Sequence, residues 1–210
     1  MTSTQVSATR QEAGQGRWWA AGAVAGPLFV LLSFAQVPFR DGFDLTRHAF
    51  SFLLTGPGGW LQEINFLVSG VLFLVAGAGL GRRVGGRARV AACGLGGGMI
   101  VGGLFAPDPS HGYPIGAPAG MPDPLTYRSV LHGLGFVVAM LSWCVLLLVL
   151  SRWFARTGRS GWATLASVTG IGLLAVPAVS TLSFGTVVLY LVVTAGYAVT
   201  SALFIRLRTA

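Results

Sequence analysis

SVLHGLGFVVAMLSWCVLLLVL, residues 129–150, decides the fold class of this chain of 210 residues. The stretch contains no Asp, Glu, Lys or Arg, and it is longer than the ~20 apolar residues that a helix needs to cross ~30 Å of hydrocarbon. The rest of the chain has the same character. It is 53% hydrophobic and 10% charged, whereas soluble domains carry about 25% charged residues. We therefore expect a membrane protein.

Apolar stretches on both sides of this segment bring the number of expected transmembrane helices to six. The chain is thus expected to be an all-α, polytopic membrane protein. Residues 1–16 are polar, and we expect them to form a disordered cytoplasmic tail before a six-helix transmembrane domain at 17–210. The third and fifth spans are short for a bilayer. The expected spans are residues 18–37, 61–80, 90–105, 129–150, 162–179 and 184–205.

The charged residues divide by side of the expected membrane. Eleven of the fourteen arginines lie in the amino-terminal segment, in two short loops and in the carboxyl tail, and the other three lie in the opposite loops. Positive charge marks cytoplasmic loops, so both termini are expected in the cytoplasm. The net charge of +8 therefore reflects how the chain is oriented in the membrane. No basic helix remains for nucleic acid, and we expect none as a partner.

The third span carries glycines at every fourth residue, Gly94, Gly98 and Gly102. Lipid offers no hydrophobic drive between helices, so small residues that allow close backbone approach mark packing faces. We expect this face to pack within the bundle. A homo-oligomer through the same glycine-rich helix is the alternative.

The first outer loop, residues 38–60, predicts a short interfacial helix. Asp44 can cap a helix that runs to about Leu54, and Gly56 and the following proline end it. In such a helix Asp44, His48 and Ser51 share one face. A Ser–His–Asp triad is disfavoured, because working triads draw their members from separate elements.

Acidic and imidazole side chains gather in the outer loops and at the outer ends of the spans. Ionisable residues at such depth are rare unless they are paired or functional. Burial raises the pKa of a carboxyl group, so Asp44 or Asp108 is expected to keep a proton that it can donate. No two histidines have the short helical spacing of a metal site, and we expect neither metal nor cofactor. The catalytic candidates are Asp44, His48, Glu63, Asp108 and His132. The candidates for substrate binding are Arg40, Phe43, Ser51, Trp60, Gln62, Asn65, Phe66, Phe105, Tyr113 and Phe136.

Two runs resemble a known family. RDGFDLTRHAFSFLLTGPGGWLQEINF at 40–66 is similar to the first outer loop and second span of the domain of unknown function 998 family. FAPDPSHGYPIGAPAG at 105–120, with LHG at 131–133, looks like its second outer loop and fourth span. The resemblance implies a small six-helix protein of the bacterial cytoplasmic membrane and no particular reaction. Its recurring polar positions correspond here to Arg40, Asp44, His48, Ser51, Trp60, Gln62, Asn65, Asp108, Pro109 and His132.

Three functions are compatible with this pattern. The first is an intramembrane enzyme that acts on a lipid or isoprenoid by acid–base chemistry near the outer leaflet, with proton-initiated cyclisation of a prenyl chain as one form. Aromatic faces around the acids could stabilise a carbocation. The second is an accessory or assembly protein whose outer loops bind a partner. The third is a small-molecule transporter, which the confinement of polar residues to one side disfavours.

Overall fold

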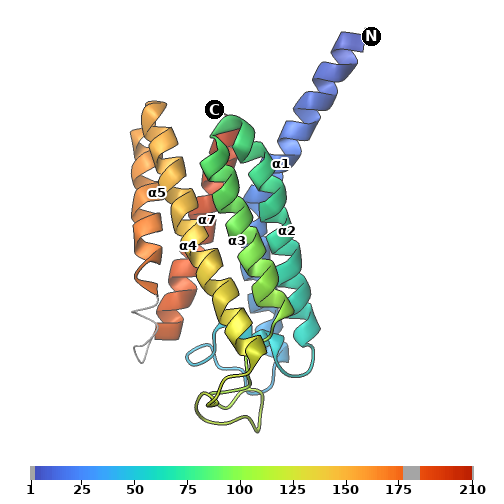
Figure 1. Cartoon of the computed structure of the whole chain (residues 1–210), viewed down its shortest axis with the longest axis vertical. Helices are drawn as coiled ribbons and strands as arrows, with labels where there is room; N and C mark the ends of the chain where they lie inside the picture. Colours follow the sequence, from blue (N-terminus) through green and yellow to red (C-terminus); the bar gives the residue numbers. More distant parts are fainter. Residues whose placement is uncertain (1–2, 177–184, 210) are drawn as a thin grey trace.

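A computed structural model describes residues 3–176 and 185–209, and describes side chains from residue 17 onward. This part of the chain is all-helical, with six α-helices and no strand (Figure 1). Two short 3₁₀ helices, η1 and η2, lie in the first connecting loop. The elements are α1 (Ser3–Gln36), η1 (Val37–Phe39), η2 (Phe50–Leu54), α2 (Gly59–Arg83), α3 (Gly86–Leu104), α4 (Tyr127–Arg156), α5 (Ser160–Leu173) and α7 (Gly185–Arg208).

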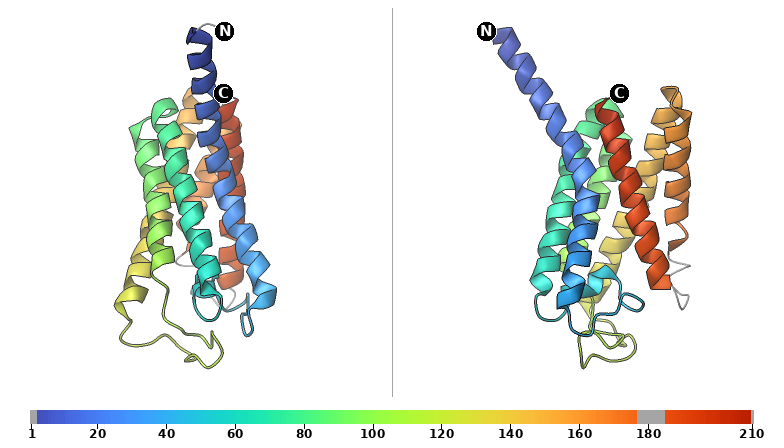
Figure 2. Two further views of the ribbon diagram at one scale, coloured as in Figure 1. Left: turned by 90° about the vertical axis from the view of Figure 1, so that its right-hand side faces the viewer. Right: turned by 180° about the vertical axis from the view of Figure 1, so that it is seen from behind.

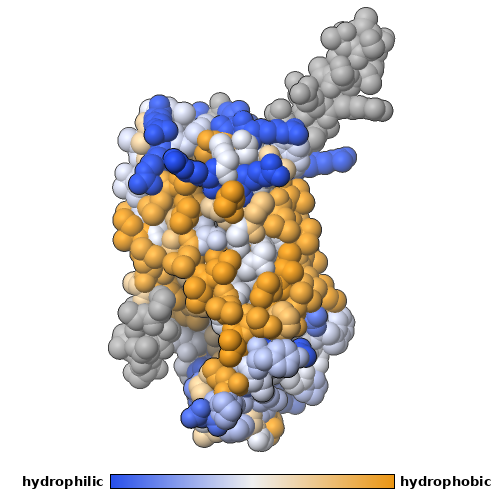
Figure 3. Space-filling model, viewed as in Figure 1, coloured by the Kyte–Doolittle hydropathy of each residue, from blue (hydrophilic) through white to orange (hydrophobic). Residues whose placement is uncertain are grey.

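The helices form one antiparallel bundle with two different ends. Both chain termini and the short arginine-containing connections lie at one end, and the long loops lie at the other (Figures 1 and 2). We call these the arginine-rich end and the loop end. On the face that Figure 3 shows, the surface between the two ends is a belt of hydrophobic side chains, with hydrophilic residues above and below it. This distribution is that of a protein whose sides face lipid.

Four of the helical segments are long and apolar enough to cross a membrane: Arg17–Phe39, Gly59–Arg83, Tyr127–Arg156 and Gly185–Arg208. The expected spans at 90–105 and 162–179 are not among them. Helix α3 is rich in glycine, which contributes little hydropathy, and α5 has only 14 residues. The end of the expected fifth span, residues 177–179, lies outside the described residues.

In the structure, the segment expected to be a disordered tail forms the first turns of α1, which begins at Ser3. These turns project beyond the bundle (Figure 2). The division of the chain at residue 17 stays a prediction.

The glycines of α3 pack the bundle from inside, as expected. A Cβ on Gly98 would lie 2.5 Å from the backbone nitrogen of Ala139, and one on Gly135 would lie 2.7 Å from that of Gly102. A Cβ on Gly96 would lie 2.5 Å from the carbonyl oxygen of Gly70 in α2. Backbone therefore meets backbone on both sides of α3, which holds it tightly between α2 and α4.

The expected interfacial helix from Asp44 to Leu54 is wrong. The chain makes a turn after Asp44, becomes extended at Ala49, and then forms the five-residue 3₁₀ helix η2. Phe50 and Leu53, three residues apart, lie on the same face of a 3₁₀ helix and are buried in the bundle. The apolar residues of this loop therefore cover the end of the helices, and Asp44, His48 and Ser51 do not share a helix face.

Candidate functional site

Arg40 anchors the first outer loop. Its guanidinium, only 7% exposed, donates hydrogen bonds to the carbonyl oxygens of Leu53, Pro57 and Gly58 and to Oε1 of Gln36. Asp44 is not among its hydrogen-bond partners. A buried guanidinium is tolerated when its donors are paired, so this residue fixes the path of the loop into α2.

A buried amide network continues from Arg40 between α1 and α2. Gln36 donates to Oε1 of Gln62 (2.7 Å), and Gln62 donates to Oγ of Ser33 (2.9 Å). Asn65 donates to Ser33 (3.1 Å) and to the carbonyl oxygen of Phe29 (2.9 Å). Gln62 and Asn65, candidates for substrate binding, are thus bonded to protein groups.

His48 joins the two outer loops. Its ring is 1% exposed, with Nδ1 accepting from the backbone nitrogen of Asp44 (2.9 Å) and Nε2 lying 3.0 Å from the carbonyl oxygen of His111. This pattern fixes the tautomer with the proton on Nε2. Phe43 and Tyr113 pack against the ring at centroid distances of 5.4 and 5.3 Å. Both ring nitrogens are occupied, so His48 braces the loops.

Asp44 is exposed and stabilises a turn. Its Oδ1 accepts from the backbone nitrogen (2.8 Å) and Oγ1 (2.7 Å) of Thr46. These hydrogen bonds, first that of the hydroxyl, lower the pKa of the Asp44 carboxyl below its ordinary value.

Asp108 clamps the start of α4. It is 8% exposed, and its carboxylate accepts from Oγ1 (2.5 Å) and the backbone nitrogen (2.8 Å) of Thr126, the N-cap residue of α4. The Thr126 hydroxyl bond is the main cause that lowers the pKa of Asp108. The expectation that burial raises the pKa of these two carboxyl groups is therefore wrong, because hydrogen bonds to the ionised form outweigh desolvation.

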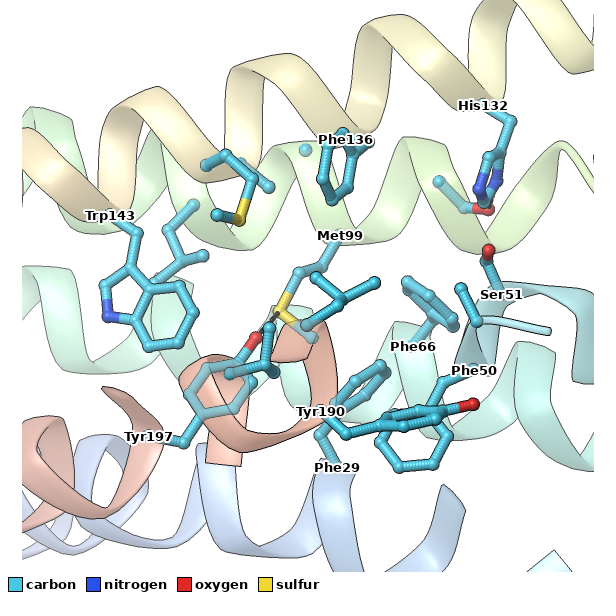
Figure 4. A pocket seen from close by; sticks show the side chains of 18 residues that line it. Phe29, Phe50, Ser51, Phe66, Met99, His132, Phe136, Trp143, Tyr190 and Tyr197 are labelled. Carbon is cyan, nitrogen blue, oxygen red and sulfur yellow. Dashed lines mark hydrogen bonds between the residues drawn. The ribbon is translucent and has the colours of Figure 1, made fainter. Parts of the chain in front are cut away.

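A cavity of about 110 Å³ lies inside the loop-end half of the bundle, and it is almost entirely apolar. One end is formed by His132 and Ser51, and the other by Trp143 and Tyr197 (Figure 4). The size is comparable with the ~150 Å³ apolar cavity that holds benzene in an engineered protein. The lining residues are Phe29, Ala49, Phe50, Ser51, Phe66, Leu95, Gly98, Met99, Gly102, His132, Phe136, Ala139, Met140, Trp143, Leu189, Tyr190, Val193 and Tyr197.

The side of the cavity faces the seam between α4 and α7. Trp143 closes this seam toward the arginine-rich end, where it stacks on Tyr197 (4.2 Å between centroids, 23°) and donates to Oγ1 of Thr200 (2.8 Å). Nearer the loop end the seam is lined by Phe136, 42% exposed, and by the half-buried Val193. Two residues of the cavity wall are therefore partly exposed at the side of the bundle.

His132 is the titratable imidazole of the cavity. Its Nδ1 lies 2.8 Å from the carbonyl oxygen of Gly102 and 2.9 Å from that of Phe105, at the carboxyl end of α3. Two carbonyl acceptors place the proton on Nδ1, which leaves the lone pair on Nε2. Within the described part of the chain, Nε2 has no hydrogen-bond partner.

Ser51 supplies the other polar group at this end. Its hydroxyl points toward the His132 ring (Figure 4), and it makes no hydrogen bond to any residue that the structure describes. The two groups come from separate elements, η2 and α4, that the sequence places far apart. Together they can orient a polar head and move one proton.

The structure brings together only some of the candidate residues. His132, Ser51, Phe66 and Phe136 line the cavity, whereas Asp44, His48 and Asp108 do not. Glu63 and Phe105 are partly buried at the same end without lining it, and Trp60 is 61% exposed. Within the described residues, no three His, Cys, Asp or Glu side chains lie close enough to hold a metal ion.

Sequence reasoning missed the contribution of α7 to the cavity. Tyr190, Val193 and Tyr197 follow one another at spacings of three and four, which puts them on one helix face. Two tyrosines on one face of an apolar span are a signal that could have found them.

The comparisons with known proteins give a family and no close relative. No curated protein and no solved structure matches the chain significantly. The family model described as "Protein of unknown function (DUF998)" matches residues 23–206, so that nearly the whole bundle is covered. The chain belongs to the DUF998 family of proteins of unknown function.

Proposed function

We propose that this chain is an intramembrane enzyme that binds the apolar chain of a lipid or isoprenoid and performs acid–base chemistry on its polar head. In this proposal all six helices cross the bacterial cytoplasmic membrane, α3 and α5 being held by their neighbours. The arginine-rich end and both termini then face the cytoplasm, and the cavity lies beneath the outer leaflet.

The observation that carries the proposal is the cavity with one polar end. Its walls are aromatic and aliphatic, and His132 and Ser51 meet at the end nearest the loops. Sites for small ligands are typically apolar clefts with a few convergent polar groups. A prenyl or acyl chain entering between α4 and α7 would fill the apolar part and present its head to His132.

His132 is the group that would move the proton. Its Nδ1–H is held by the Gly102 and Phe105 carbonyls, so the free Nε2 can accept a proton from water, from an alcohol or from an activated carbon. An imidazolium is too weak an acid to protonate an isolated alkene. The geometry therefore favours isomerisation or hydrolysis over the proton-initiated cyclisation that Asp44 or Asp108 was expected to drive.

The packing toward the arginine-rich end disfavours transport. Leu147, Leu150 and Phe154 of α4 and Phe204 of α7 are fully buried there. A transporter needs a path on both sides of its site, which this core would have to open.

A turnover assay tests the enzyme proposal. Purified protein is incubated with prenyl alcohols, prenyl diphosphates and acyl esters, and products are identified by mass spectrometry. His132→Gln is expected to lower turnover at least ~100-fold, the usual contribution of a general acid–base group. Asp44→Asn, a change outside the cavity, is the matched control and should retain the turnover of the wild type. Equal turnover in His132→Gln and wild type would remove His132 from the reaction.

A protein without catalysis gives a different outcome. If no substrate class is converted while a partner protein is retained through the outer loops, the accessory role is supported instead.

A further inference from the structure

A cleft lies at the arginine-rich end, between the start of α3 and the end of α4, far from the cavity. Three arginines line it: Arg87 from α3, and Arg152 and Arg156 from α4, which are all exposed. Trp153 lies among them, and the guanidinium of Arg83 lies 5.9 Å above its ring. Residues 81–90 and 149–162 contain no Asp or Glu, so neither connection supplies a carboxylate to these cations.

An apolar groove continues from this cleft along the outer face of the same two helices. Gly86, Arg87 and Val149 belong to both. Small residues of α3, Ala91 and Gly94, form its floor. Its rims are lipid-facing, with Val90 71% and Val145 49% exposed.

The cleft is positively charged and the groove is apolar, so together they match a molecule with an anionic head and an apolar chain. Figure 3 shows hydrophilic residues at this end directly above the hydrophobic belt. A phosphate in the cleft would meet guanidinium groups, which bind phosphate through paired, charge-assisted hydrogen bonds. The chain attached to that phosphate would lie along the groove, where a soluble anion has nothing to contact.

We propose that this surface binds an anionic phospholipid of the inner leaflet, with its phosphate among Arg87, Arg152 and Arg156 and one acyl chain along the α3–α4 groove. Basic clefts between membrane helices on the cytoplasmic side recognise acidic lipid headgroups. A second copy of this chain is disfavoured as the occupant, because a two-fold interface would bring the three arginines of each copy together.

The test compares lipids and two triple variants. Binding of phosphatidylglycerol to the detergent-solubilised full chain is measured by native mass spectrometry, with phosphatidylcholine and soluble glycerol phosphate as the other ligands. The variant R87Q/R152Q/R156Q is expected to weaken phosphatidylglycerol binding about tenfold or more. The variant R82Q/R206Q/R208Q removes the same charge at the same end, outside the cleft, and should leave tight binding in place.

The groove has its own variants. Val90→Trp fills the groove and is expected to lower retention of phosphatidylglycerol with all arginines present, whereas Val168→Trp, on the exposed face of α5, should not. The proposal is overturned by equal losses in the two triple variants, by glycerol phosphate competing as well as the lipid, or by R87Q/R152Q/R156Q changing the oligomeric state, which would make this face a contact between copies.

Discussion

The loop end holds two groups of polar residues that differ in what their polar atoms contact. The first group, which we call the loop clamps, is Arg40, His48 and Asp108. Their polar atoms are hydrogen-bonded to other protein groups. The second, the cavity head, is Ser51 and His132, which line the cavity. Among the described residues, the Ser51 hydroxyl and Nε2 of His132 have no hydrogen-bond partner. Both groups are polar and lie at a similar depth, so neither property distinguishes them. The hydrogen-bond partners do distinguish them: a polar group that is bonded within the protein has a structural role, and one without such a partner is available for chemistry.

The largest loss of stability is expected from Arg40→Met. The change leaves the carbonyl oxygens of Leu53, Pro57 and Gly58 without their guanidinium donor. Hydrogen bonds to a charged group contribute about 1.5–3 kcal/mol each, and three of them are lost here, so we expect the free energy of unfolding to fall by more than about 3 kcal/mol. Thermal melting in detergent measures it. Arg47→Met, at an exposed position, is the control, and similar melting of the two variants would contradict the clamp.

A smaller loss is expected from Asp108→Asn. The amide offers one acceptor oxygen where the carboxylate offers two, so one of the two Thr126 donors loses its bond. We expect a loss of about 2 kcal/mol. The exposed Asp123→Asn serves as control. A variant as stable as wild type would mean that Thr126 caps α4 without help.

The dependence of stability on pH, in the acid range, should reflect the same hydrogen bonds to Asp108. Hydrogen bonds from Thr126 hold the pKa of Asp108 below its ordinary value, and those from Thr46 do so for Asp44. A carboxyl with a lowered pKa in the folded state stabilises fully above its unfolded pKa of about 4, and this contribution is lost as pH falls through the lowered value. The melting temperature should therefore drop below about pH 4, and Asp108→Asn should flatten that drop. An unchanged slope would contradict the assignment.

The smallest effects on stability are expected at the cavity head. His132→Gln loses the ring contact to the Gly102 and Phe105 carbonyls, for which we expect about 1 kcal/mol. The Ser51 hydroxyl has no partner among the described residues, so Ser51→Ala should change stability by less than about 0.5 kcal/mol. Differential scanning fluorimetry checks both. A loss at Ser51 as large as that at Asp108 would move Ser51 into the group of clamps.

The architecture could be predicted from the sequence because lipid imposes it. The apolar stretch at 129–150 and the glycines of α3 carry signals that depend on composition and spacing alone, and α4 and the α2–α3–α4 packing follow them. The family likewise followed from local runs, such as residues 40–66.

The site could be predicted only in part, because the hydrogen-bond partners of its residues come from distant parts of the chain. The sequence around Asp108 gives no sign that Thr126, eighteen residues later, donates the hydrogen bond that lowers the pKa of its carboxyl group. The turn after Asp44 replaced the expected helix because Phe50 and Leu53 are buried by folding the loop back onto the bundle. Ser51 and His132 lie at the same end of the cavity only once η2 and α4 are in place.

Photocrosslinking tests the cavity as a chain-binding site most directly. Solubilised protein is irradiated with a prenyl or a fatty-acyl chain that carries a diazirine, and the labelled peptides are mapped by mass spectrometry. Val193→Trp fills the cavity from α7, and Leu191→Trp adds the same ring on the exposed face, at a residue 65% exposed. The account predicts label on Met140 and Val193 peptides in wild type and Leu191→Trp, and its loss in Val193→Trp. Label spread over all lipid-facing helices and unchanged by Val193→Trp would contradict it.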